Sequence, residues 1–382
     1  MTRILHVFTS SKFVPFVRPI LSRLLAYGYE PHVITSAGPE LASLEALGVH
    51  VHTVEMSRKI TPLADLRSLF QLRRVMRRID PELVHLHTPK GGLLGALAAT
   101  SLGLGPRIYQ MHGTPWLSAE GFLKGLYWCT EATSSRLAHQ TLAVSPSLLQ
   151  AGVRAGFLRR ESSGVLGGGS AYGVDTERFP HVGRDDSPEG LRARLGLGAE
   201  VCVLGFAGRY IEEKGLAELG VVLRGVRRQF PSAVLLLAGA PDGPVPEVLE
   251  ELRASPGVID LGYQSDMLAF YRALDVFLLP SHREGLSTVL LEAMSVGVPA
   301  VGARTVGIVD VIDHGRTGYL APKGDGAELS RLALEMLSSP ELCRQFAEAG
   351  AEKVRRSFRT ETIVSDLLSL YTKLGAPPPR SA

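Results

Sequence analysis

The sequence predicts an α/β protein made of two Rossmann-like, doubly wound domains. Strand-like apolar runs alternate with helix-like segments in both halves, which is the pattern of a parallel sheet with helices on both faces. A glycine- and proline-rich stretch separates the halves. The length of 382 residues is enough for two domains that each bury a core.

The first half alternates the two kinds of element in order. Apolar runs predict strands over Ile4–Phe8, His32–Thr35, Val49–Val54, Leu83–Leu86 and Ile108–Met111. Apolar residues three or four positions apart predict helices over Pro15–Tyr27, Leu63–Ile79 and Leu93–Leu102.

The second half repeats the pattern. Its predicted strands are Val201–Ala207, Ala233–Ala238, Val258–Leu261, Val276–Leu279 and Ala300–Val301. Its predicted helices are Leu216–Arg228, Met267–Leu274, Leu286–Val296 and two or three more that end near Leu374.

The stretch Ser162–Arg194, with its triple glycine Gly167–Gly169, has the composition of a linker. We therefore expect a first domain over 1–185, a second over 186–355, a C-terminal helix over 356–375 that packs back on the first domain, and a frayed tail over 376–382. Open parallel sheets bind ligands beyond the carboxyl ends of their strands, so domains facing across a cleft would each offer one ligand site.

Charge is unevenly distributed along the chain. Residues 1–180 hold 19 Lys and Arg against 12 Asp and Glu, whereas the remainder holds 22 against 26. A basic first half favours an anionic partner, or it serves solubility only. The predicted helix with arginines at 67, 73, 74, 77 and 78 could rest on anionic lipid, or it could be a solvated outer face. The chain shows no basic and aromatic module for nucleic acid.

Cysteine usage and hydropathy bear on the compartment. Three scattered cysteines are too few for a disulfide framework and fit a reducing cytoplasm. The N-terminal apolar run has the length of a strand, and no stretch approaches the ~18 apolar residues of a membrane span. We expect a cytoplasmic protein with at most peripheral contact at the inner membrane face, where Phe13, Val14, Phe16 or Trp116 could insert.

The segment Gly205–Gly215 is the first motif with chemical content. It follows an apolar strand and opens a helix, and it places Arg209 and Lys214 at that turn. An arginine fork and a lysine point charge are complementary ways to hold a diphosphate. The alternative is two solvated basic residues in a turn.

The second motif is Pro280–Ala293. Glu284 ends the loop after a strand, and Ser287 lies where the next helix begins. The free N–H groups in the first turn of that helix could therefore meet a phosphate. Glu292 follows Glu284 by eight residues, about 12 Å along an ideal helix. Two carboxylates at that separation could accept hydroxyl hydrogen bonds at the two ends of one nucleotide-sugar, or Glu292 could be a partnered core carboxylate.

Together these motifs resemble the retaining GT-B glycosyltransferases of family GT4. The resemblance rests on Gly208–Gly215 and on Glu284 with Glu292, and it extends to Gly168–Phe179, which is similar to the Gly-Val-Asp linker of that family, and to Tyr271–Glu284. It covers nearly the whole chain. It implies a donor site in the second domain, where Arg209 and Lys214 hold the diphosphate, Glu284 contacts the sugar hydroxyls and Glu292 binds the ribose. The implied donor-binding set is Arg209, Lys214, Tyr263, Glu284, Gly285, Leu286, Ser287 and Glu292.

The first domain resembles members of the family that build capsules, lipopolysaccharide or other surface glycans. The resemblance lies in Val84–Gly95 and Gln110–Pro115, and it implies that His112 contacts the donor sugar near the reaction centre. His87 and Lys90 are then candidates for the acceptor side. Many relatives have a glycine-rich loop after the first strand, but this chain has Thr9–Pro15. Lys12 could replace the phosphate contact of that loop, and it is the third candidate for the acceptor side.

No metal site is predicted. His85, His87 and His112 lack a carboxylate or cysteine partner at a recognisable spacing, and the chain has no Asp-x-Asp. We therefore expect Arg209 and Lys214 to neutralise the leaving group, with no metal and no cofactor.

The sequence thus predicts a metal-independent hexosyltransferase that moves a sugar from a nucleotide-sugar, UDP-linked, to a lipid-linked glycan acceptor with retention at the anomeric carbon. Retention rests on the family resemblance alone, and His112, Glu284, Arg209 and Lys214 form the predicted catalytic set. The alternatives are a nucleotide-sugar epimerase of the same fold and a non-catalytic nucleotide-sugar-binding subunit of a glycan-assembly complex.

Overall fold

The computed structural model describes residues 2–113, 115–187 and 189–378. It divides into two compact units, the first formed by residues 1–173 and 360–382 and the second by residues 174–359. Thr114 of the Gln110–Pro115 motif and the end of the expected tail lie outside the described residues. The division at 173/174 differs from the expected 185/186 because Val174 N donates to Phe358 O at 2.8 Å and Phe179 packs in the core of unit 2.

Unit 1 is built on a parallel sheet in the order β3-β2-β1-β4-β5-β6-β7. Its strands are β1 (Arg3–Val7), β2 (Glu30–Thr35), β3 (His50–Thr53), β4 (Leu83–His87), β5 (Arg107–Met111), β6 (Gln140–Ala143) and β7 (Ser163–Gly164). Strand β4 is buried along its whole length, as expected for a central strand with helices on both faces.

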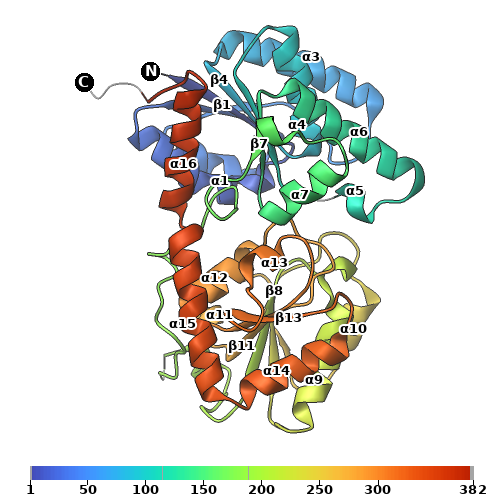
Figure 1. Ribbon diagram of the computed structural model, residues 1–382, viewed down its shortest axis with the longest axis vertical. Helices are drawn as coiled ribbons and strands as arrows, with labels where there is room; N and C mark the ends of the chain where they lie inside the picture. Colours follow the sequence, from blue (N-terminus) through green and yellow to red (C-terminus); the bar gives the residue numbers. More distant parts are fainter. Residues whose placement is uncertain (1, 114, 188, 379–382) are drawn as a thin grey trace. The chain divides into compact units, whose positions relative to one another are not determined.

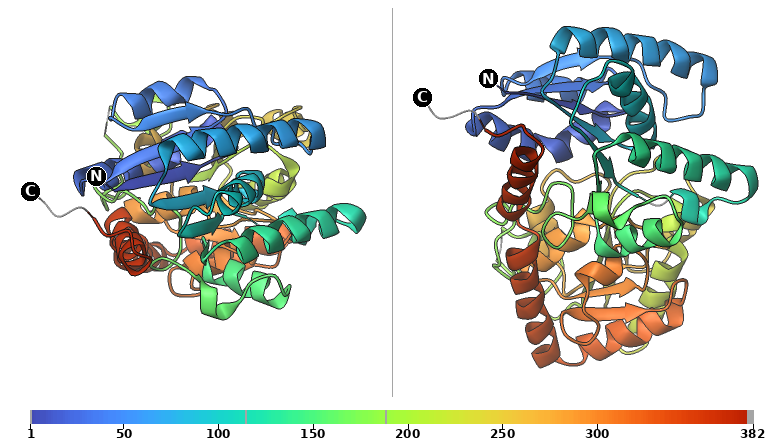
Figure 2. Two further views of the ribbon diagram at one scale, coloured as in Figure 1. Left: turned by 90° about the horizontal axis from the view of Figure 1, so that it is seen from above. Right: turned by 45° about the horizontal axis from the view of Figure 1, so that its top comes forward.

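Helices cover both faces of this sheet (Figures 1 and 2). On one face lie α1 (Val14–Ala26), α2 (Ala42–Glu45) and the C-terminal α16 (Thr360–Lys373), and on the other α3 (Pro62–Ile79), α4 (Pro89–Ser101), α6 (Gly121–Leu137) and α7 (Pro146–Arg154), with the short α5 (Pro115–Ser118) beside α6. Three short 3₁₀ turns are η1 (Ser11–Phe13), η2 (Pro39–Leu41) and η3 (Arg160–Ser162). Ile363, Leu367 and Tyr371 of α16 belong to the core that α1 covers.

Unit 2 has a parallel sheet in the order β10-β9-β8-β11-β12-β13. The strands are β8 (Val203–Ala207), β9 (Val234–Ala238), β10 (Val258–Asp260), β11 (Val276–Leu279), β12 (Ala300–Ala303) and β13 (Gly318–Ala321). The central strands β8 and β11 and their neighbours β9 and β12 are buried throughout, which explains their unbroken apolar runs.

The helices of unit 2 pack in two layers (Figure 1). One layer contains α9 (Leu216–Arg227), α10 (Glu247–Arg253) and α14 (Gly326–Leu337), and the other α11 (Met267–Arg272), α12 (Thr288–Val296) and α15 (Pro340–Ser357). Shorter helices are α8 (Leu191–Arg194), α13 (Ile308–Val311) and the 3₁₀ turn η4 (Glu212–Lys214).

Candidate active site

In unit 2, strand order reverses between β8 and β11, and the loops that follow these two strands meet there. Such a switch point is where open α/β sheets bind ligands. Lys214 follows β8 and Glu284 follows β11, and the distance from Lys214 Nζ to Glu284 Oε1 is 2.6 Å. Their side chains are 14% and 10% exposed. The structure therefore brings two predicted catalytic residues into one contact at the expected edge of the sheet.

Two glycines fix this contact. Gly215 has a φ of +75°, and a Cβ there would lie 2.5 Å from the carbonyl oxygen of Pro280. Gly307 has a φ of +82°, and its Cβ would lie 2.5 Å from the carbonyl oxygen of Gly285. Only glycine combines a left-handed backbone with such close approach. The loops after β8 and β12 thus press on the Glu284 turn from two directions.

Arg209 lies at the rim of the same edge. Its Nη1 atom is 2.5 Å from Asp242 Oδ2, which comes from the loop after β9, and its side chain is half exposed. A guanidinium has five N–H donors, so this single contact leaves capacity for a ligand. Asp242 was not identified from the sequence, because a strand order that puts the β8 and β9 loops side by side is not visible in the local pattern.

Helix α12 begins at Thr288, later than the expected Leu286. Ser287 is the N-cap, and its side chain makes no capping hydrogen bond, so the N–H groups of the first turn receive no side-chain acceptor from it. Gly285 and Ser287 are buried and Leu286 is partly buried just before the helix. Because Glu284 lies in the loop, the ideal-helix spacing used to relate Glu284 to Glu292 does not apply.

Glu292, on α12, has a hydroxyl partner. Tyr271 donates its O–H to Glu292 Oε2 at 2.7 Å, and burial raises the pKa of Glu292 to about 7. The contact explains how a carboxyl group is accommodated among apolar residues. The second carboxyl oxygen remains as an acceptor, so the contact does not exclude the predicted ribose contact.

Tyr263 projects from the loop after β10, and it is 81% exposed. Asp260 Oδ1 accepts a hydrogen bond from Gly262 N at 2.8 Å, and Gln264 Nε2 donates to Leu261 O at 2.5 Å. These bonds order the loop around a tyrosine whose own ring lies in solvent. Its predicted role near a nucleobase stays a prediction.

Unit 1 has its own switch point, between β1 and β4. The loops after these strands are joined by Thr9 Oγ1 and Thr88 Oγ1 at 2.7 Å, and Gly91 N donates to Thr9 Oγ1 at 3.0 Å. Lys12 is exposed in η1, on the loop after β1. The ammonium of Lys90 instead turns toward the start of α3, where Nζ is 2.7 Å from Asp65 Oδ1.

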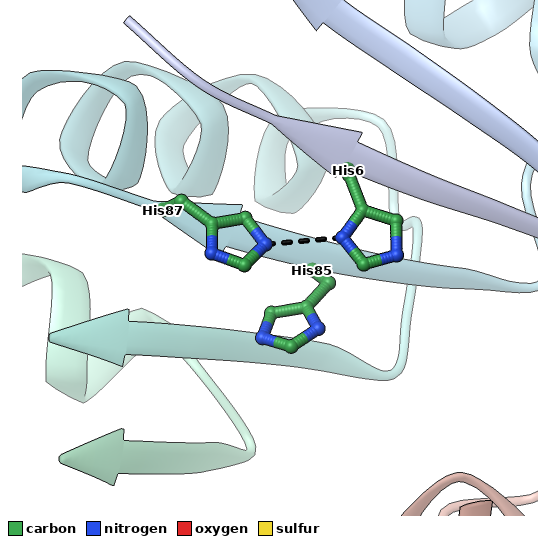
Figure 3. A group of neighbouring side chains, drawn as sticks. All are labelled: His6, His85 and His87. Atoms are coloured by element: carbon green, nitrogen blue, oxygen red, sulfur yellow. Dashed lines mark hydrogen bonds between the residues drawn. The ribbon is translucent and has the colours of Figure 1, made fainter. Parts of the chain in front are cut away.

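His112 follows β5 and ends a chain of imidazoles. His112 Nε2 is 3.1 Å from His87 Nδ1, and His87 Nε2 is 3.0 Å from His6 Nδ1. Figure 3 shows the contact between His6 on β1 and His87 on β4, with His85 below them. His6 was missed from the sequence, although its place opposite His85 in the β1–β4 register puts it on the same face as the His85-x-His87 pair.

Burial keeps these imidazoles neutral at pH 7. It lowers the pKa of His112 to about 4 and that of His6 to about 3, and it lowers the pKa of His85 and His87 well below the usual value. Each ring therefore carries one N–H and one lone pair. Along the chain every link needs a donor and an acceptor, so the tautomers of His6, His87 and His112 are coupled.

Aromatic rings surround this row of hydrogen-bonded histidines. Phe8 stacks on His87 with ring centroids 4.2 Å apart, and Phe13 and Tyr172 each lie 5.8 Å from the ring of His112. His112 is partly exposed, unlike His87 and His6. It is thus the member of the chain that can meet a ligand.

Two family models match the chain. One, for glycosyl transferases group 1, matches residues 189–353, and the other, glycosyl transferase 4-like, matches residues 3–139. The chain belongs to the group 1 glycosyltransferases. The first model covers Arg209, Lys214, Glu284 and Glu292. The second covers the hydrogen-bonded histidines His6, His87 and His112.

Named relatives of this glycosyltransferase agree with the assignment. The Staphylococcus aureus capsular polysaccharide biosynthesis glycosyltransferase CapM is 27% identical over 97% of this chain and 96% of its own length. An Escherichia coli UDP-Gal:alpha-D-GlcNAc-diphosphoundecaprenol alpha-1,3-galactosyltransferase is 24% identical over 71% of this chain and 70% of its own length.

Solved structures confirm the GT-B fold of the chain. Anabaena HepE in complex with UDP-glucose superposes with a TM-score of 0.81 over 98% of this chain and 100% of its own, at 20% identity. Within the described residues of this glycosyltransferase, none of the helices combines the length and apolar character needed to span a bilayer.

Proposed function

We propose that this glycosyltransferase moves a sugar from a UDP-linked donor to a lipid-linked glycan with retention of anomeric configuration. The observation that carries the donor assignment is the contact of Lys214 with Glu284 at the β8/β11 switch point. Lys214 and Glu284 are 2.6 Å apart there, and in this proposal the ammonium holds the diphosphate and the carboxylate holds the sugar hydroxyls. The UDP-glucose complex of HepE and the UDP-galactose donor in the name of the E. coli relative support this choice of nucleotide.

In the proposed mechanism, charge on the departing diphosphate is stabilised by Lys214, by Arg209 and by the N-terminus of α12. Prearranged charges of this kind are the largest contribution in many enzymes. The bond between the anomeric carbon and the diphosphate oxygen breaks, and the acceptor hydroxyl oxygen bonds to that carbon on the same face. The leaving phosphate oxygen takes the hydroxyl proton. Glu292 and Tyr263 would hold the ribose and the base, and His112 would contact the sugar.

One assay separates this proposal from its two alternatives. The protein is incubated with UDP-sugars with and without a lipid-linked glycan acceptor. Acceptor-dependent release of UDP with a glycosylated product supports transfer, isomerisation of the free UDP-sugar supports an epimerase, and donor binding without either reaction supports a non-catalytic subunit. A thermal-shift screen identifies which UDP-sugars to use in this assay, because a tightly bound ligand raises the melting temperature of the protein.

Transfer is expected to survive chelation. In the proposed mechanism Arg209 and Lys214 neutralise the diphosphate, and the chain has no Asp-x-Asp. Initial rates measured after treatment with EDTA should equal those of untreated enzyme. A loss of activity that Mn²⁺ or Mg²⁺ restores would show that a metal ion, rather than these side chains, neutralises the charge on the leaving diphosphate.

The acceptor side of the proposal rests on the surface of α3. Leu63, Leu66 and Phe70 are exposed on this helix by 87%, 52% and 61%, and they line a shallow surface depression together with Arg67 and Arg74. Exposed apolar side chains interleaved with arginines match a bilayer surface that carries anionic head groups. We therefore propose that α3 rests on an anionic membrane, peripherally, with the lipid-linked acceptor in that membrane.

The structure corrects the residues expected to insert. Val14 and Trp116 are buried in unit 1, at 1% and 2% exposure, so they have no apolar surface to offer a bilayer. Phe13 is partly buried near His112. Phe16 is half exposed, but it belongs to α1, on the face of the sheet opposite α3, so it is not part of the proposed α3 contact (Figure 1).

Vesicle flotation tests the membrane contact. Wild-type protein should float with vesicles that contain anionic lipid and should be released by salt, because charge attraction to the surface is screened. The double variant R67E/R74E should lose most of this binding, since each basic residue near anionic lipid contributes about 1 kcal/mol. A reversal of two exposed arginines of unit 2, R228E/R356E, should bind like wild type. Binding that is equal for both double variants would overturn the role of α3 and leave the transferase assignment intact.

A further inference from the structure

A second group of histidines lies at the other end of the unit 1 sheet. Glu30 and His32 are at the start of β2, and His50 is at the start of the edge strand β3, where the β2–β3 register pairs it with His32. The amino ends of the strands are opposite the carboxyl ends that carry Thr9 and Thr88. This group is therefore separate from the candidate active site of unit 1.

The three side chains converge on one point. Glu30 Oε1 is 3.2 Å from His32 Nε2 and 3.5 Å from His50 Nε2, and the three ligand atoms all lie within 4.8 Å of one another. Ligand atoms bound to one tetrahedral zinc ion at 2.0–2.2 Å are roughly 3.4 Å apart. The two distances from the carboxylate oxygen fall on either side of this value.

A further histidine, His52, orients the ring of His32. His32 Nδ1 is 3.1 Å from His52 Nε2, and His52 lies two residues beyond His50 on the same face of β3. A metal-binding imidazole almost always uses its second ring nitrogen in a hydrogen bond that fixes its orientation. His52 provides this bond for His32, whose ring is buried while its Nε2 points to Glu30.

The group is accessible. Glu30 and His32 line a cavity of about 370 Å³ together with His52, Arg3, Val75, Arg78 and Ile79, which leaves room for water as a further ligand. His50 is not part of this lining. Arg3 brings positive charge, but its guanidinium is held by Glu82 at 3.2 Å and by Asp80 at 3.3 Å. His50 is 55% exposed. Its ring, stacked on His32 at 4.7 Å, can therefore turn about its last torsion to aim at an ion.

We propose that Glu30, His32 and His50 form a binding site for a divalent transition-metal ion of the zinc class. The ion would link β2 to the edge strand β3. Two imidazoles and one carboxylate are ligands that zinc, cobalt and nickel accept, whereas magnesium and calcium prefer oxygen alone. Because the site is apart from the catalytic set, its occupancy stabilises unit 1 without taking part in transfer.

Cobalt and zinc binding to the full chain test this proposal. After treatment with EDTA and its removal, wild-type protein should bind one Co²⁺ and show the visible absorption of a four-coordinate site. Zn²⁺ should displace the Co²⁺ and should raise the melting temperature. His50→Ala and Glu30→Gln should abolish the absorption and the thermal shift. His52→Ala should weaken binding by about 10–100-fold, since it removes only the orienting bond.

The control is His181→Ala, which removes an exposed histidine of unit 2 and should bind like wild type. Circular dichroism should show that His50→Ala and Glu30→Gln remain folded, because both side chains are at least partly exposed. Stoichiometric Co²⁺ binding that persists in both variants would place the ion elsewhere, for example at His6, His85 and His87, and would overturn the proposal. So would wild-type protein that binds no metal.

Discussion

Lys214→Ala is expected to lower turnover by roughly 10²–10³-fold, because it removes one charge aimed at the departing diphosphate. In the folded protein the ammonium of Lys214 is already held by Glu284 at 2.6 Å, and both side chains are largely shielded from solvent. Shielding strengthens the interaction of this cation with phosphate oxygens compared with an exposed lysine. Arg209→Ala should act in the same direction and within the same range. Steady-state rates with saturating acceptor measure both effects.

Loss of Lys214 also leaves Glu284 without its partner, so stability needs its own control. Lys353 offers a close match in unit 2, since its side chain is 15% exposed and its Nζ atom is 2.8 Å from Asp313 Oδ1. Lys353→Ala should destabilise unit 2 to a similar degree and retain transfer. If Lys214→Ala and Lys353→Ala have the same activity, the diphosphate assignment is wrong.

The sequence located these donor-side residues because each follows a strand whose apolar run is unbroken. The ends of β8 and β11 could be predicted within a residue or two, and glycines marked the turns that follow. The contact between Lys214 and Glu284 could not be predicted from the pattern, because it joins residues 70 positions apart through the pairing of β8 with β11. Strand order is a tertiary property that local periodicity does not contain.

Short or weakly periodic elements were missed for a related reason. Strand β13 is a four-residue run that begins with a glycine, and the apolar residues of α6 have no regular helical spacing. The domain boundary moved to Gly173 because Val174 pairs with Phe358, a contact between distant segments that a glycine-rich composition cannot show. Composition identified the linker region but not Val174 as the residue at which the chain begins to pack into unit 2.

His112→Ala is the second variant with a large expected effect, a loss of roughly 10²–10³-fold in turnover. The proposal places this imidazole against the donor sugar, and a positioned histidine commonly contributes rate factors of about 10²–10⁴ when it exchanges a proton and about 10²–10³ when it donates a hydrogen bond. Burial lowers its pKa to about 4, so the ring acts as a neutral donor or acceptor near pH 7. Single-turnover rates with bound donor measure this effect apart from product release.

His87→Phe is expected to lower the same rate by a smaller factor, because His87 is buried and in this proposal positions His112 rather than meeting the acceptor. It removes the contact at 3.1 Å that couples the tautomer of His112 to His6, while the aromatic ring keeps the packing against Phe8. Nitrogen-15 NMR of the imidazoles should show a mixture of His112 tautomers in His87→Phe and a single tautomer in wild type. His85→Phe is the matched control, since His85 is equally buried and hydrogen-bonds to Tyr371 rather than to His112. A loss of rate in His85→Phe as large as in His87→Phe, with His112 unchanged in both spectra, would assign the histidines to core packing and reject their role in orienting His112.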